Sequence, residues 1–160
     1  MSLSHLNQDG EVHMVDICAK DRSCRLARAR CSVQFPENIL SKIMDEGIEK
    51  GDLFAAARMA GIQAAKQTPD IIPLTHPIAL DYAGIDLQPQ PGENRIKIEA
   101  TVKASDATGV EMEALNAASA AALTIYDMCK SESKKLNITD LHLVEKKGGK
   151  SGHWKSEANS

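Results

Sequence analysis

The segment that most limits the fold is a helical pattern from Glu113 to Lys130, with the sequence EALNAASAAALTIYDMCK. It contains no glycine or proline, and nearly all of its residues are small or apolar. The pattern predicts one long helix over about residues 109–130. Its alanine-rich face would allow close approach to a sheet, to a second helix or to another subunit.

Two segments alternate between apolar and polar residues, as half-buried strands do. Every second side chain is apolar in residues 27–35, and the same alternation runs through residues 95–104. Another strand is predicted over residues 80–87, and the turn sequence QPQPGEN joins it to the next strand. A last strand is predicted over residues 140–146.

The remaining elements are helices and one loop. Pro36 opens a short helix that Gly47 closes, and Asp52 is the expected N-cap of a second helix. That second helix must end before Pro69. The following segment, TPDIIPLTHP, contains three prolines and predicts a constrained loop rather than a helix or a central strand.

The predicted order is therefore strand, helix, helix, strand, strand, helix, strand (βααββαβ). Without the short first helix, this is the order of a ferredoxin-like α+β fold, an antiparallel sheet with helices packed on one face. A chain of 160 residues is expected to form a single domain over residues 1–160. We expect a flexible N-terminal arm over about residues 1–20 and a flexible, glycine-rich C-terminal tail over about residues 148–160.

Composition excludes several classes of protein. The formal net charge of -3 argues against a general nucleic-acid binder, and no apolar run approaches the length of a membrane span. The four cysteines have no zinc-type spacing and no signal-peptide pattern precedes them, so we expect reduced thiols in a cytoplasmic protein. Basic residues cluster in residues 20–30 and 130–150, which favours a small phosphorylated ligand, although solvated surface charge is the alternative.

Two glutamates begin the long helix. Thr108 and Glu111 have the spacing of a capping box, and we favour that structural role for Glu111. Glu113 has no such role. It could simply suit the helix dipole, or a partly buried carboxylate there could accept two N–H bonds from a guanine-like or pterin-like edge.

The far end of the same helix carries Asp127 and Lys130, three residues apart and so on one face. An exposed ion pair is the simplest interpretation. However, Asp127 faces the unfavourable end of the helix dipole, and a polar stripe through Asn116 and Thr124 leads to it, which predicts that the pair lines a cleft. The dipole would raise the pKa of Asp127 and Lys130 would lower it; the sequence leaves the net direction open.

Other candidates lie in loops. His76 is held between Pro73 and Pro77, which suits proton transfer or phosphate contact, and Thr75 could donate a hydroxyl bond to the same ligand. Lys50 immediately precedes a helix N-terminus, where anions bind, but the sequence is not a P-loop. Each of these residues could also be an ordinary solvent-exposed polar residue.

A distance argument limits how these residues meet. Glu113 and Asp127 lie about 21 Å apart along one helix, which is long for one nucleotide-sized ligand to bridge. If both ends serve one site, a second subunit of a symmetric oligomer supplies one of them.

Three motifs together carry a family resemblance: KGDLFAAARMAGIQAAKQTPDIIPLTHP, TGVEMEALNAASAAALTIYDMCK and KKGGKSG. With HMVDICAKDRSCRLARA, they resemble the molybdenum cofactor biosynthesis protein C (MoaC) family of cyclic pyranopterin monophosphate synthases, over about residues 5–154. The resemblance implies a lyase that converts 3′,8-cyclo-7,8-dihydroguanosine 5′-triphosphate, supplied by a radical-SAM enzyme, to cyclic pyranopterin monophosphate and pyrophosphate. It also implies a ferredoxin-like homohexamer, a trimer of dimers with sites at subunit interfaces.

By motif, the resemblance implies Asp127, Lys130 and Lys50 as catalytic residues. It implies seven substrate-binding residues: Leu74, Thr75, His76, Met112, Glu113, Arg25 and Lys146. The family usually has Leu-Cys-His where this chain has Leu74-Thr75-His76, so a hydroxyl replaces the thiol at this position. No protein metal site and no tightly bound cofactor is expected, and Mg²⁺ could accompany the substrate triphosphate.

The alternative is a non-catalytic ferredoxin-like module that binds a nucleotide. RNA binding is poorly supported, because the strand RIKIEATVKA has no stacking aromatic residue and the chain has only five aromatic residues in all.

Overall fold

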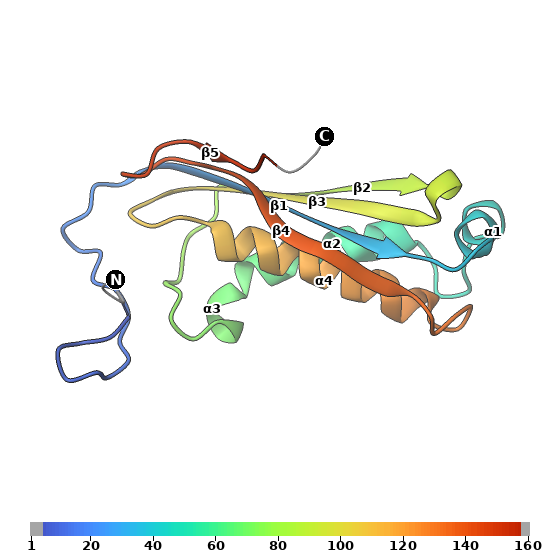
Figure 1. Cartoon of the computed structure of the whole chain (residues 1–160), viewed down its shortest axis with the longest axis horizontal. Coiled ribbons are helices and arrows are strands. Elements are labelled where there is room, and N and C mark those ends of the chain that lie inside the picture. Colours follow the sequence, from blue (N-terminus) through green and yellow to red (C-terminus); the bar gives the residue numbers. More distant parts are fainter. Residues whose placement is uncertain (1–4, 158–160) are drawn as a thin grey trace.

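The computed structural model describes residues 5–157, which form one antiparallel sheet with helices on one face (Figure 1). Residues 1–4 of the predicted arm and 158–160 of the predicted tail lie outside the described residues. The strands and helices, in chain order, are β1 (Ser23–Gln34), α1 (Ile39–Glu46), α2 (Leu53–Lys66), α3 (Thr68–Ile71), β2 (Tyr82–Gln90), the 3₁₀ turn η1 (Pro91–Glu93), β3 (Arg95–Asp106), α4 (Glu111–Cys129), β4 (Asn137–Lys147) and β5 (Trp154–Lys155).

The strand order across the sheet is β2-β3-β1-β4-β5, with every neighbouring pair antiparallel. The first four positions are the ferredoxin-like arrangement, which confirms the predicted α+β fold. Beyond them, Trp154 pairs with Lys146, so a short edge strand that the sequence did not predict folds back on β4. None of the helices in residues 5–157 is long and apolar enough to cross a membrane.

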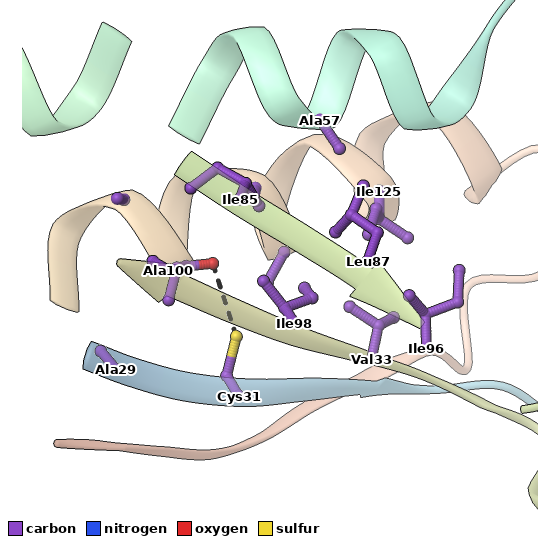
Figure 2. Packing of buried hydrophobic residues seen from close by; sticks show 14 of the residues in the cluster. Ala29, Cys31, Val33, Ala57, Ile85, Leu87, Ile96, Ile98, Ala100 and Ile125 are labelled. Atoms are coloured by element: carbon purple, nitrogen blue, oxygen red, sulfur yellow. Dashed lines mark hydrogen bonds between the residues drawn. The ribbon is translucent and has the colours of Figure 1, made fainter. Parts of the chain in front are cut away.

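The core lies between the sheet and the helices α2 and α4 (Figure 2). Ala29 and Val33 of β1 and Ile98 of β3 point to the helix side and are fully or almost fully buried, as their alternation predicts. Ala117, Ala118, Ala121 and Ala122 of α4 are completely buried against them. The Cys31 thiol also donates to the Ala118 carbonyl at 3.4 Å, so the small side chains bring the α4 backbone within reach of β1.

Gly61 sets the approach of α2 to the rest of the core. A Cβ atom built at this position would lie 2.7 Å from Cγ1 of Ile85 and 2.9 Å from the carbonyl oxygen of Ala117. These contacts are closer than side-chain carbons tolerate, so the packing of α2 against β2 and α4 requires a residue without a Cβ there.

Two helix ends lie where the sequence predicted them. Asp52 caps α2, because its carboxylate accepts the Ala55 N–H at 2.9 Å. Gly47 ends α1 with a positive φ of 78°, and its N–H donates to the Ile43 carbonyl.

Two predictions were wrong. The segment expected to be a loop contains α3, because Pro69 sits in the first turn of the helix, where its missing N–H is not needed. The capping box is also absent. The helix begins at Glu111 with Val110 as its N-cap and no side-chain cap, so Thr108 lies two residues too early to reach the first-turn amides.

Candidate active site

Seven of the ten predicted residues lie in two groups, one near each end of α4. Met112 and Glu113 lie in its first turn, close to the chain segments that carry Arg25 and Lys146. Asp127 lies in its last turn, together with Lys130 and Lys50. The two ends are about 21 Å apart along the helix.

At the C-terminal end of α4, two lysines surround one carboxylate. The Lys130 Nζ donates to Asp127 Oδ1 at 2.6 Å, and the Lys50 Nζ lies 3.7 Å from Asp127 Oδ2. Lys50 also donates to the backbone carbonyl of Asp127 at 2.7 Å. Lys50 comes from the turn between α1 and α2, which bends at Gly51 with a φ of 97°. Residues distant in sequence therefore converge on Asp127.

The two lysines settle the charge of Asp127. The hydrogen bond and charge of Lys130 lower the pKa of Asp127, and the charge of Lys50 adds to this effect. Reciprocally, Asp127 raises the pKa of Lys130. The lysines therefore outweigh the helix dipole. The cluster therefore holds an ionised carboxylate, which is a potential base, beside the side chains of Lys130 and Lys50, which are potential acids.

The predicted cleft around Asp127 is not formed within one chain. The Asp127 side chain is 62% exposed, and so it lies on an open surface. Asn116 does not extend a polar stripe toward it, because its side-chain amide donates to the Ala64 carbonyl of α2 at 2.8 Å. Thr124 likewise bonds its own helix, at the Ala120 carbonyl. These two polar residues satisfy backbone acceptors rather than line a ligand site.

At the N-terminal end of α4 lies a pocket of about 820 Å³. Five basic residues line it against two acidic ones, and the basic residues are Lys20, Arg25, Lys146, Lys147 and Lys150. Residues 107–109 and Glu111 form the wall at the start of α4, and the loop 148–151 forms another wall. No side chain caps the first turn of α4. Excess positive charge beside a helix N-terminus suits a phosphorylated ligand.

Arg25 is the buried basic residue of this pocket, with 9% of the residue exposed. It belongs to the side of β1 that faces the helices, as Ala27 does, so its guanidinium reaches the start of α4. Lys146 pairs with Ala27 across the sheet and lines the same pocket, where it contacts the Ser151 hydroxyl. Lys147 instead forms an ion pair with Glu145 at 3.0 Å.

Glu113 is nearly buried, with 2% of the residue exposed, whereas its neighbour Met112 is 37% exposed. Burial raises the pKa of Glu113 to about 7, and the charges of Glu111 and Asp106 act in the same direction. Near neutral pH, Glu113 is therefore present in both protonation states. It could accept hydrogen bonds as a carboxylate or donate one as an acid.

The loop after α3 carries Leu74, Thr75 and His76, all of them half-buried. It follows α3, which is held to the first half of α4 because Asn116 also donates to the Thr68 hydroxyl at 3.3 Å. The Thr75 hydroxyl donates to the Ile72 carbonyl at 2.8 Å, so its proton stabilises the loop itself. A hydrogen bond from Thr75 to a ligand would require this one to break.

Sequence reasoning missed the backbone groups that hold Arg25. The carbonyls of Asp106 and Ala107 accept its Nε and Nη2 protons at 2.9 and 3.0 Å. No motif reveals such a bond, because any residue supplies a carbonyl. Within residues 5–157, no three His, Cys, Asp or Glu side chains are grouped closely enough to hold a metal ion.

The fold and the pocket define a ferredoxin-like α+β protein with a cationic cavity suited to a small phosphorylated molecule. The MoaC family model matches residues 14–149, most of the chain. The chain belongs to the MoaC family, and so it has a catalytic role in molybdenum cofactor biosynthesis with a small-molecule substrate.

Proposed function

We propose that this protein is a cyclic pyranopterin monophosphate synthase, a lyase. Its substrate would be 3′,8-cyclo-7,8-dihydroguanosine 5′-triphosphate, supplied by an upstream radical-SAM enzyme, and its products cyclic pyranopterin monophosphate and pyrophosphate. The observation that carries the proposal is the pairing of a cationic pocket at one end of α4 with an ionised Lys50-Asp127-Lys130 cluster at the other. The reaction needs both phosphate binding and proton transfer.

The pocket supports the phosphate step. A substrate hydroxyl attacks the α-phosphorus and releases its proton to solvent, the bond from the α-phosphorus to the oxygen that bridges to the β-phosphate breaks, and pyrophosphate leaves with that oxygen. Arg25 and Lys146 would stabilise the negative charge that develops on the leaving oxygens, with Mg²⁺ as a further counter-ion that the triphosphate could bring with it. The Glu113 carboxyl would recognise the N–H groups of the guanine-derived ring, and Met112 and residues 74–76 would also contact the substrate.

The Asp127 cluster supports the rearrangement of the ring, which requires several proton transfers. Asp127 is ionised and would act as the base, Lys130 is protonated and would act as an acid, and Lys50 would act beside them. General acid-base catalysis by such groups contributes about 10²–10⁴-fold in rate.

The two ends of α4 would belong to the same active site only across a subunit interface. A ligand of nucleotide size does not bridge about 21 Å of helix. The exposed Asp127 cluster of one subunit would therefore close the Arg25 pocket of another, in the homohexamer typical of the family. Burial at that interface would also remove the cluster from water, which strengthens its electrostatic interactions.

The direct test is to incubate the full chain with the cyclic dihydro-GTP intermediate. Pyrophosphate release by a coupled assay and pterin formation by fluorescence after oxidation should rise together. Absence of both products with well-folded protein would contradict the proposal. The second candidate, a non-catalytic nucleotide-binding module, predicts tight binding of the intermediate without either product.

A further inference from the structure

Asp106 is the last residue of β3, and its carboxylate has no role in the proposed reaction. We propose that Asp106 is a positioning residue, which fixes the peptide group that holds the Arg25 guanidinium in the phosphate pocket. This inference rests on the proposed function only in taking Arg25 as a phosphate ligand. The positioning itself follows from the hydrogen bonds.

Two of the five N–H groups of Arg25 are used by the protein. The Nε–H donates to the carbonyl of Asp106 at 2.9 Å, and one Nη2–H donates to the carbonyl of Ala107 at 3.0 Å. Among residues 5–157, the other three N–H groups have no protein acceptor. Because the guanidinium lines the pocket, those three groups are available to the oxygens of a bound phosphate.

The Asp106 side chain controls the orientation of its own carbonyl. Its Oδ1 accepts the N–H of Ala107 at 2.7 Å, and the residue is only 8% exposed. That N–H and the Asp106 carbonyl belong to one planar peptide unit and point in opposite directions. Holding the N–H therefore aims the carbonyl at Arg25 Nε. No ion pair joins Asp106 and Arg25 in the described chain, so the Asp106 carboxylate acts through the peptide rather than by direct contact.

On its Nη1 side, Arg25 lies close to the backbone of the loop 148–151, which lines the same pocket. Gly149 has a φ of 75°, and a Cβ built there would overlap Arg25 Nη1. The guanidinium thus contacts the Asp106 and Ala107 carbonyls through Nε and Nη2 and lies close to the backbone of Gly149 through Nη1.

Two substitutions of Asp106 test this proposal, because they are expected to affect pyrophosphate binding differently. Asp106→Asn keeps an Oδ1 acceptor for the Ala107 N–H, whereas Asp106→Ala removes it. Affinity for inorganic pyrophosphate is measured by calorimetry on the full chain at fixed salt and about pH 8.5, where Glu113 is ionised. We expect Asp106→Ala to weaken binding about threefold to tenfold, the value of one hydrogen bond, and Asp106→Asn to bind like the wild type.

Cys31→Ala is the matched control, because Cys31 is a buried residue on the same face of β1, about 20 Å from Arg25 along the strand. It should lower the melting temperature without changing pyrophosphate affinity. If it weakens binding as much as Asp106→Ala does, the effect of Asp106 is merely structural. Unchanged affinity in Asp106→Ala would likewise overturn the proposal.

A measurement without ligand tests the positioning of Arg25 independently of the proposed function. The Nε–H signal of Arg25 in a ¹⁵N spectrum can be assigned by its loss in Arg25→Lys. The Nε proton should exchange slowly with water in the wild type and in Asp106→Asn, and rapidly in Asp106→Ala. Equal exchange rates in all three would overturn the positioning role. If exchange differs as expected but neither the wild type nor any variant binds pyrophosphate, the phosphate pocket fails while the positioning stands.

Discussion

Lys130 Nζ lies 2.6 Å from Asp127 Oδ1, within one turn of α4, and the Lys50 ammonium approaches the other oxygen of the same carboxylate. Two cations from different parts of the chain therefore share one exposed anion. Asp127 is ionised and Lys130 protonated over the neutral pH range, since the pKa of Asp127 is lowered and that of Lys130 is raised. These shifts hold Asp127 in its proton-accepting form and Lys130 in its proton-donating form.

The first prediction concerns Asp127→Asn. The amide keeps the shape of the side chain and an oxygen acceptor for Lys130, so the melting temperature should change little. Pyrophosphate release should fall about a hundredfold or more, because the amide is not a base. Asp45→Asn is the control, since Asp45 is exposed in the last turn of α1. Near-normal turnover in Asp127→Asn would remove Asp127 from the catalytic role.

The second prediction is a pH dependence of stability that originates at Glu113. Its pKa is about 7 in the folded protein against an ordinary value of 4.5, so the folded state binds the extra proton between these values. Stability therefore falls as pH rises from about 4.5 to about 7, by about 3 kcal/mol if no other group compensates. Glu113→Gln should remove this loss.

The measurement is urea unfolding of the wild type and Glu113→Gln at about pH 5 and about pH 8. The variant should gain stability relative to the wild type at the higher pH. Glu37→Gln, at an exposed position, should show no such gain. A wild type that gains stability relative to Glu113→Gln as pH rises would mean that the carboxylate is stabilised in the fold, contrary to this account.

The third prediction tests the packing of α2. Gly61→Ala places a Cβ against Ile85 and the Ala117 carbonyl, and should destabilise the fold by about 1–3 kcal/mol. Gly92→Ala meets no atom within 4 Å and should change the unfolding free energy by less than about 0.5 kcal/mol. Equal effects of the two substitutions would show that α2 does not approach the core as closely as described.

The sheet and long helices could be predicted because local patterns determine them. The alternation around Val33 and Ile98 marks the buried face of each strand, and Asp52 marks a helix start. A sequence pattern does not indicate where a helix begins when a possible capping residue and the packing of an apolar residue favour different starts. At Thr108 the capping spacing is present, but Val110 is 1% exposed and the helix begins one residue after it.

The candidate site was less predictable for a physical reason. Asp127 and Lys50 are 77 residues apart and meet through the packing of α1, α2 and α4, so no spacing in the sequence relates them. The family motifs identified Asp127 and Lys50 as candidate residues, but they did not indicate how the two side chains are arranged in space. Asn116 shows the converse error: a polar residue on a helix face suggested a ligand cleft, but its partner is a backbone carbonyl of α2.

The last prediction tests the division of the active site between subunits. Arg25→Ala and Asp127→Asn should each be inactive alone, because each removes one end of every site. In mixed oligomers formed from equal amounts, an intact Arg25 pocket from one chain can meet an intact Asp127 cluster from the other, and about a quarter of the activity should return.

Mixing Asp127→Asn with Lys50→Ala is the matched control for this experiment. Both residues lie at the same end of α4 in one chain, so no combination of these two variants restores an intact cluster. Native mass spectrometry would verify that mixed oligomers form in both experiments. Recovery in the control, or none with Arg25→Ala despite mixed oligomers, would contradict a site shared in this way. Recovery only in the first mixture would show that Asp127 and Arg25 act together across the interface, which the length of α4 prevents them from doing within one chain.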